Sequence, residues 1–183
     1  MGNVVDLIMN DHRELERLFE QLQNQPDARA NTLPVMISLL TAHSRAEEAE
    51  VYPAATEAGV ADKVEHSQKE HLEADQLAAD LAATPVDAPD FEEKLTKLVD
   101  AVKHHVEEEE TTVLPGMQSG LPSERLAELG EAFLASREEH LGEMPEDITK
   151  DQLEQQAENA NISGGSAKTK DELAADLKAA AEH

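Results

Sequence analysis

The spacing of apolar residues along this chain predicts helices. Apolar side chains recur three and four positions apart, which is the period of one helix face, and no stretch alternates with the period of two that strands show. Four long segments carry this pattern, and clusters of proline, glycine and polar residues separate them. We expect helices from a cap at Asn3 or Asp6 to about residue 24, from a cap at Thr32 to just before Pro53, and over residues 61–81 and 91–114.

Each of the four apolar stripes leads into a histidine, and two of them also lead into a glutamate. These inward positions are His12, His43, Glu47, His71, His105 and Glu109. A carboxylate in an apolar stripe must be paired, bound to a metal ion or neutralised, because burying an isolated charge is costly. The stripes therefore predict a polar centre inside an otherwise apolar core.

The second and fourth segments repeat one motif. In both, a histidine precedes a glutamate by four residues, a second glutamate follows directly, and a proline stands ten residues after the histidine, at Pro53 and Pro115. Positions four apart share a helix face, so each copy projects an imidazole and a carboxylate side by side. This donor set is typical of first-row transition-metal sites.

Composition narrows the chemistry. The 183 residues contain no cysteine, which excludes disulfides, thiolate zinc sites, iron–sulfur clusters and thiol catalysis. A formal net charge of -25 argues against nucleic acid and anionic membrane surfaces as partners. The N-terminus lacks the features of a secretion signal, and no apolar run approaches membrane-spanning length, so we expect a cytoplasmic protein.

Together these features predict an all-α protein in two parts. Residues 1–144 are expected to form an up-down-up-down four-helix bundle with an additional helix around residues 123–140. Residues 145–183 are expected to form a small helical tail, because Thr149-Lys150-Asp151-Gln152-Leu153 returns as Thr169-Lys170-Asp171-Glu172-Leu173. Each copy reads as a capping box that opens a short helix.

Four imidazoles and two carboxylates suit two first-row metal ions with the glutamates as bridges, and about two coordination positions stay open. The alternative for any single inward histidine is a hydrogen-bonded core residue. Six such groups without metal would leave costly buried charge, which favours the ligand interpretation. Glu48 and Glu110 are expected to face solvent or, alternatively, to support the ligands, and Tyr52 to pack at a helix end or lie near the metal. His66, His104 and His140 are expected on the surface.

The twice-repeated histidine-then-glutamate pattern, with a further histidine on each partner helix, resembles the hemerythrin-like HHE cation-binding domain. The resemblance covers about residues 1–142 and includes Asp11-His12, Tyr52-Pro53, Glu70-His71 and Leu114-Pro115. It implies a non-haem centre of two iron ions with a bridging oxo or hydroxo group, which binds or reacts with dioxygen, hydrogen peroxide or nitric oxide. Relatives that carry oxygen reversibly have a histidine four residues before the one on the third helix, where this chain has Ser67.

The resemblance leaves several functions open. One is an enzyme resembling a catalase or peroxidase that handles oxidative or nitrosative stress. The second is a sensor or store of iron, oxygen or nitric oxide without turnover. A reversible oxygen carrier is disfavoured by Ser67, and a redox-inert structural metal is a further alternative. The tail resembles Rho-N-like and SAP-like modules, which can bind nucleic acid. Its excess of acidic residues argues against that role and leaves a protein partner open.

Overall fold

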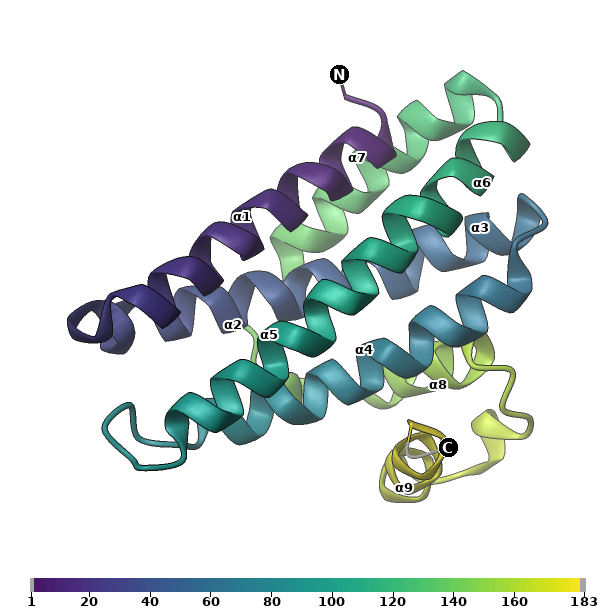
Figure 1. Ribbon diagram of the computed structural model, residues 1–183. Coiled ribbons are helices and arrows are strands. Elements are labelled where there is room, and N and C mark those ends of the chain that lie inside the picture. The colour runs from purple at the N-terminus through teal and green to yellow at the C-terminus, as the bar shows by residue number, and fades with distance from the viewer. Residues whose placement is uncertain (1, 182–183) are drawn as a thin grey trace.

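The computed structural model describes residues 2–181, and those residues form helices without any strand. This confirms the all-α prediction. Four long helices lie side by side (Figure 1): α1 Val4–Asn24, α2 Arg29–Ala46, α4 Ala61–Ala82 and α5 Phe91–Glu108. The other helices are α3 Tyr52–Glu57, α6 Leu114–Gly120, α7 Ser123–His140, α8 Lys150–Asn159 and α9 Lys170–Ala181. Of these, α7 has 18 residues and is as long as α2 and α5. No helix in the described part of the chain is long and apolar enough to cross a membrane.

The start of α1 agrees with the prediction from the sequence, and the start of α2 does not. Asn3 caps α1, because its side chain accepts a hydrogen bond of 2.7 Å from the backbone N–H of Val5. The prediction that Thr32 caps the second helix is wrong, since α2 begins at Arg29 and Thr32 is buried inside it. The Arg29 guanidinium donates to the carbonyl of Leu22 at 2.8 Å, which fixes this early start against the end of α1.

The two repeated prolines do not end their helices, contrary to the prediction. Each follows a wide π-helical turn, Glu47–Val51 and Glu109–Val113, and α3 and α6 continue directly from these turns. In an α-helix a proline ring clashes with the carbonyl four residues earlier. The wide turn avoids that geometry, because the residue before each proline donates its N–H to the carbonyl five residues back.

The polar centre divides the core into two apolar clusters. One cluster is built from the parts of α1, α2, α4 and α5 on one side of the histidines and includes Phe19, Met36, Leu81 and Phe91. The other includes Ile8, Met117 and Phe133, and it joins α7 to α1 and the turns after α2 and α5. Packing on both sides therefore holds the histidine-bearing segments in place.

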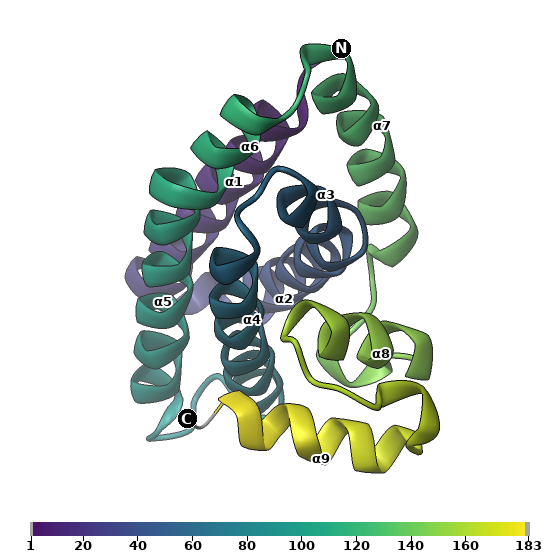
Figure 2. The ribbon, with the colours of Figure 1, turned by 90° about the vertical axis from the view of Figure 1, so that its right-hand side faces the viewer.

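The C-terminal residues pack against α4 (Figure 2). The 3₁₀ turn Pro145–Asp147, α8 and α9 all contact that helix, and a small cluster seals the contact through Leu72, Leu153, Ala157, Leu173 and Leu177. Both predicted capping boxes are confirmed. The N–H of Gln152 donates to Thr149 Oγ1 at 3.3 Å, and the N–H of Glu172 donates to Thr169 Oγ1 at the same distance.

Candidate metal centre

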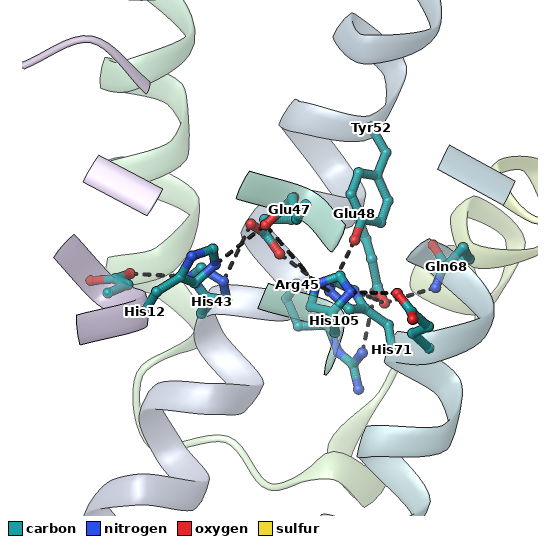
Figure 3. Close-up of polar contacts among 12 residues, drawn as sticks. His12, His43, Arg45, Glu47, Glu48, Tyr52, Gln68, His71 and His105 are labelled. Carbon is teal, nitrogen blue, oxygen red and sulfur yellow. Dashed lines mark hydrogen bonds and ion pairs between the residues drawn. The ribbon is translucent and has the colours of Figure 1, made fainter. Parts of the chain in front are cut away.

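The structure brings all six predicted ligands into one cluster in the middle of the bundle, and Figure 3 labels five of them, the four histidines and Glu47. His12 comes from α1, His43 from α2, His71 from α4 and His105 from α5, while Glu47 and Glu109 open the two π turns. Their relative exposures lie between 0% and 5%, so the cluster is shielded from solvent.

The histidines form two pairs with a carboxylate between them. His12 and His43 have ring centroids 5.1 Å apart, and the Nε2 atoms of His71 and His105 are 3.0 Å apart. Glu47 faces both pairs, because its Oε1 lies 3.2 Å from His43 Nε2 and its Oε2 lies 3.2 Å from His71 Nε2. One carboxylate therefore presents one oxygen to each pair, as a bridging ligand does.

Glu109 also lies between the two histidine pairs. Its Oε2 is 3.3 Å from His12 Nε2 and 4.0 Å from His105 Nε2. Glu109 thus also touches both pairs, one histidine from each. His12, His43 and Glu47 form one group with metal-ligand spacing, and Glu47, His71 and His105 form a second.

The hydrogen bonding of the cluster fits a cation. Within the described residues, both carboxylate oxygens of Glu47, both of Glu109 and Nε2 of His12 are buried without a hydrogen-bond partner. Both Glu47 oxygens and Glu109 Oε2 face imidazole nitrogens at 3.2–3.3 Å, so either protons on those rings or a bound cation must supply the counter-charge that buried carboxylates need.

The distances fit the same conclusion. Metal–nitrogen and metal–oxygen bonds of about 2.1 Å that meet at about 90–109° separate neighbouring ligand atoms by about 3.0–3.4 Å. The spacings of 3.0 Å between His71 and His105, 3.2 Å from each of His43 and His71 to Glu47, and 3.3 Å between His12 and Glu109 fall in this range. The residues present therefore fit two first-row metal ions.

All four histidines turn their Nε2 atom toward the centre, and the Nδ1 atom of each contacts a carboxylate. The contacts are 2.8 Å for His12 with Glu110, 3.4 Å for His43 with Asp11, 3.3 Å for His71 with Glu48, and 3.0 Å for His105 with Glu70. Such a partner fixes the ring orientation and the tautomer, and it makes Nε2 a stronger donor.

The sequence analysis predicted only some of these carboxylates that contact the histidine Nδ1 atoms. The expectation that Glu48 faces solvent is wrong, because Glu48 is buried, whereas the Glu110 side chain remains 20% exposed. The alternative, that the two glutamates support the ligands, matches their contacts with His71 and His12. Asp11 and Glu70 were missed in this role, although each stands directly before a predicted ligand. Their targets lie on neighbouring helices, so a pattern within one helix does not reveal them.

The contacts show an approximate two-fold symmetry. Asp11 of α1 supports His43 of α2, and Glu70 of α4 supports His105 of α5. One half consists of α1 and α2 with the turn that follows, and the other of α4 and α5 with the turn that follows. Glu48 of the first half contacts His71 of the second, and Glu110 of the second half contacts His12 of the first. The sequence repeat of α2 and α5 therefore extends to α1 and α4.

Tyr52 breaks this symmetry. It is fully buried, and its hydroxyl oxygen lies 2.9 Å from His71 Nε2, which is the ring nitrogen that points to the centre. The repeat places Leu114 at the corresponding position of the other half. Burial, followed by the charges of Glu47 and Glu109, raises the pKa of the Tyr52 phenol well above its ordinary value, so this group stays protonated. Only the His71 and His105 half has a hydroxyl donor at this position.

Without metal, protons occupy the cluster. Burial lowers the pKa of His12, but the carboxylates of Glu109 and Glu47 outweigh it and raise that pKa to about 9. Burial likewise lowers the pKa of His71, and Glu47 and Glu48 raise it to about 10. Burial raises the pKa of Glu109, but His12 and His105 bring it down to about 2.

A small cavity of about 10 Å³ lies among the four histidines, and Leu15, Leu40, Val102 and Val106 help to line it. This volume is close to the minimum that one water molecule requires. The cavity therefore holds at most one water-sized molecule, and a larger ligand would need the surrounding side chains or helices to move.

Comparisons with known proteins agree with the site. The family model of the hemerythrin HHE cation-binding domain matches residues 3–116. A protein named DNA nickase from Nostoc sp. is 29% identical over 137 residues, which make up 74% of this chain and 39% of that protein. This chain thus spans about two-fifths of that relative. A crystal structure of a hemerythrin HHE cation-binding domain-containing protein from Mycobacterium kansasii matches with a TM-score of 0.70 and 23% identity, over 78% of this chain and 89% of that one, which shows a shared fold.

Proposed function

Because this chain belongs to the hemerythrin HHE cation-binding domain family, we propose that its buried cluster holds two iron ions and reacts with hydrogen peroxide, dioxygen or nitric oxide. His12 and His43 would hold one ion, His71 and His105 the other, and Glu47 and Glu109 would bridge them. The observation that carries this proposal is the pair of buried central glutamates without hydrogen-bond donors.

When bound, the two irons supply redox electrons and open coordination positions for small ligands. The chain supplies orientation, exclusion of water and proton control. Leu15, Leu40, Val102 and Val106 make the cavity apolar and small. The four outer carboxylates hold the imidazoles in fixed orientations, so little reorganisation is needed when a ligand arrives.

Tyr52 places a hydroxyl proton donor beside His71. Its hydroxyl hydrogen stays bound at neutral pH, and the oxygen lies 2.9 Å from His71 Nε2. A phenol at this place can donate a hydrogen bond to a small ligand beside His71, and it can pass a proton as peroxide is cleaved. This asymmetry favours peroxide chemistry over reversible oxygen carriage, in agreement with Ser67 at the position where the oxygen carriers have a histidine.

The first test measures metal and turnover together. Protein loaded with Fe²⁺ without oxygen and then desalted is expected to hold two irons per chain and to release oxygen continuously when hydrogen peroxide is added. Glu109→Ala is expected to lose iron and this activity. Glu107→Ala, which changes an exposed glutamate of the same helix, is the matched control and should behave as wild type. Retention of both irons by Glu109→Ala would contradict the bridging role.

A sensor is the second candidate function, and one contact favours it. Gln156 of α8 donates to both oxygens of Glu48 at 3.1 Å, and Glu48 contacts His71. The C-terminal helices are therefore linked to the centre through a single intervening carboxylate, so a change at the metal can alter what they contact. A single spectral change on adding peroxide, without sustained oxygen release, would favour this candidate over the enzyme.

A further inference from the structure

A second group of metal-type donors lies on the surface between α4 and α5. His66 comes from α4, and His104 and Glu108 come from α5. The Nε2 atom of His66 lies 3.0 Å from Glu108 Oε2, and one ligand atom from each of the three residues lies within 4.8 Å of the others. Their side chains are 53%, 65% and 39% exposed in the order His66, His104 and Glu108, so an ion can reach them from solvent.

The donor set indicates what kind of ion this group would take. Two imidazoles and one carboxylate suit first-row transition metals, whereas magnesium and calcium prefer sites built from oxygen alone. A metal ion that is held by only three protein ligands would take water molecules in its remaining coordination positions. Such a site binds an ion more weakly than the buried cluster does, and it exchanges that ion readily.

Glu70 connects this surface group with the buried centre. Its Oε2 lies 3.0 Å from Nδ1 of His105, one of the buried ligands. Its Oε1 lies 3.5 Å from both His66 Nε2 and His104 Nε2, and within the described residues it is buried without a hydrogen-bond partner. One carboxylate therefore faces the surface group with one oxygen and the centre with the other.

The surface next to the group attracts cations. A hollow of about 360 Å³ opens beside Glu70 and His104, and its lining includes the carboxylates of Glu73 and Asp100 and the single lysine Lys97. The chain as a whole carries a formal charge of -25, which raises the local concentration of positive ions.

We propose that His66, His104 and Glu108 form a surface site for one divalent transition-metal ion, from which the ion enters the buried centre past Glu70. The entry step rests on the proposed function of the buried centre. The binding step does not, because it needs only the three surface donors. The alternative is that the two histidines are ordinary surface residues held by their ion pairs with Glu70 and Glu108.

Zinc titration of iron-loaded protein tests the binding step, because the buried ligands are then already in use. Calorimetry is expected to show one further Zn²⁺ per chain. The His66→Ala, His104→Ala double variant should bind this ion at least about tenfold more weakly, because it loses two of three ligands. His140→Ala, which removes a histidine outside the group, should match wild type. Equal zinc binding by the double variant would overturn the site.

Loading kinetics test the entry step. Metal-free wild type and the metal-free double variant are each mixed with one equivalent of Co²⁺, and the visible absorption of the bound ion reports how fast the buried centre fills. We expect the double variant to fill about tenfold more slowly and to reach the same final occupancy. Loading at the wild-type rate would overturn the entry route. The zinc titration is repeated on Glu109→Ala, so that a failure of the buried centre is seen separately from a failure of the surface site.

Discussion

At the scale of single residues, the centre depends on two carboxylates that are buried in the middle of the bundle. Glu47 and Glu109 are 0% exposed, and no side chain in the described part of the chain donates a hydrogen bond to them. Burying such a carboxylate costs several kcal/mol, and either protonated imidazoles at 3.2–3.3 Å or a metal cation between the two carboxylates can offset that cost. Their sequence context, four residues after a histidine, places an imidazole beside each carboxylate.

The hydroxyl of Tyr52 is expected to matter for reactivity rather than for metal binding. Tyr52→Phe keeps the buried ring and removes only the oxygen that lies 2.9 Å from His71 Nε2. We expect two irons per chain as in wild type and an oxygen release from peroxide that falls about 10- to 100-fold, because a positioned proton donor is lost. Metal analysis and an oxygen electrode measure the two effects. Wild-type turnover in Tyr52→Phe would show that the hydroxyl only packs.

Protonation of the ligands makes metal uptake depend on pH. In the metal-free protein, His12 with a pKa of about 9 and His71 with a pKa of about 10 hold protons at neutral pH. Ligation requires the neutral imidazole, so binding must release about two protons per chain. The apparent affinity for Co²⁺ is therefore expected to rise from pH 6.5 to pH 8.5. Calorimetry in buffers of different ionisation enthalpy counts these protons, and a pH-independent affinity without proton release would contradict the assignment.

At the scale of helices, the two π turns bring the central glutamates to their places. Each turn begins at one of these glutamates and ends just before the residue that precedes a proline. The apolar stripes predicted the long helices and the inward face of each, because both depend on local spacing. They did not predict the π turns, because a proline in a sequence more often marks the end of a helix.

The contacts of α8 were also beyond the reach of sequence patterns. Gln156 and Glu48 are 108 residues apart, and a buried glutamine carries no spacing signal. The outer carboxylates Asp11 and Glu70 were missed for a similar reason, because each supports a histidine on another helix. Periodicity thus predicts which side chains point inward, while the partners of those side chains depend on packing between helices.

Gln156 is expected to tune the metal through Glu48. Gln156→Ala removes two hydrogen bonds of 3.1 Å from a carboxylate that contacts His71. Loss of a direct partner of a ligand weakens metal binding by about 10- to 100-fold, and Gln156 lies one contact further out, so we expect a loss of at most about 10-fold. We expect a competition titration with a chelator to show this loss in Gln156→Ala and wild-type affinity in Glu158→Ala, an exposed change on the same helix. Equal affinities of both variants would show that α8 does not influence the centre.

At the scale of the whole molecule, the metal site lies between two apolar clusters and joins four helices. Folding must therefore bring charged groups into the core, and ions bound there would stabilise the folded state because the unfolded chain lacks the assembled site. An ion present at 100 times its dissociation constant adds about 2.7 kcal/mol to the free energy of unfolding.

Removing the metal should therefore lower thermal stability. For a chain of this size, one bound ion at that concentration corresponds to a rise of about 5–10 °C in the unfolding midpoint. Calorimetry or circular dichroism on chelator-treated and iron-loaded protein measures the difference. The Glu109→Ala variant is expected to show a much smaller response to iron, and a wild-type response in that variant would place the stabilising ion elsewhere.

The most direct test of the central claim is anomalous X-ray diffraction at the iron absorption edge, recorded from crystals of the iron-loaded protein. The account predicts two iron peaks inside the bundle, one beside His12 and His43 and the other beside His71 and His105, with Glu47 and Glu109 between them. A single internal peak, or iron bound only outside this cluster, would contradict it.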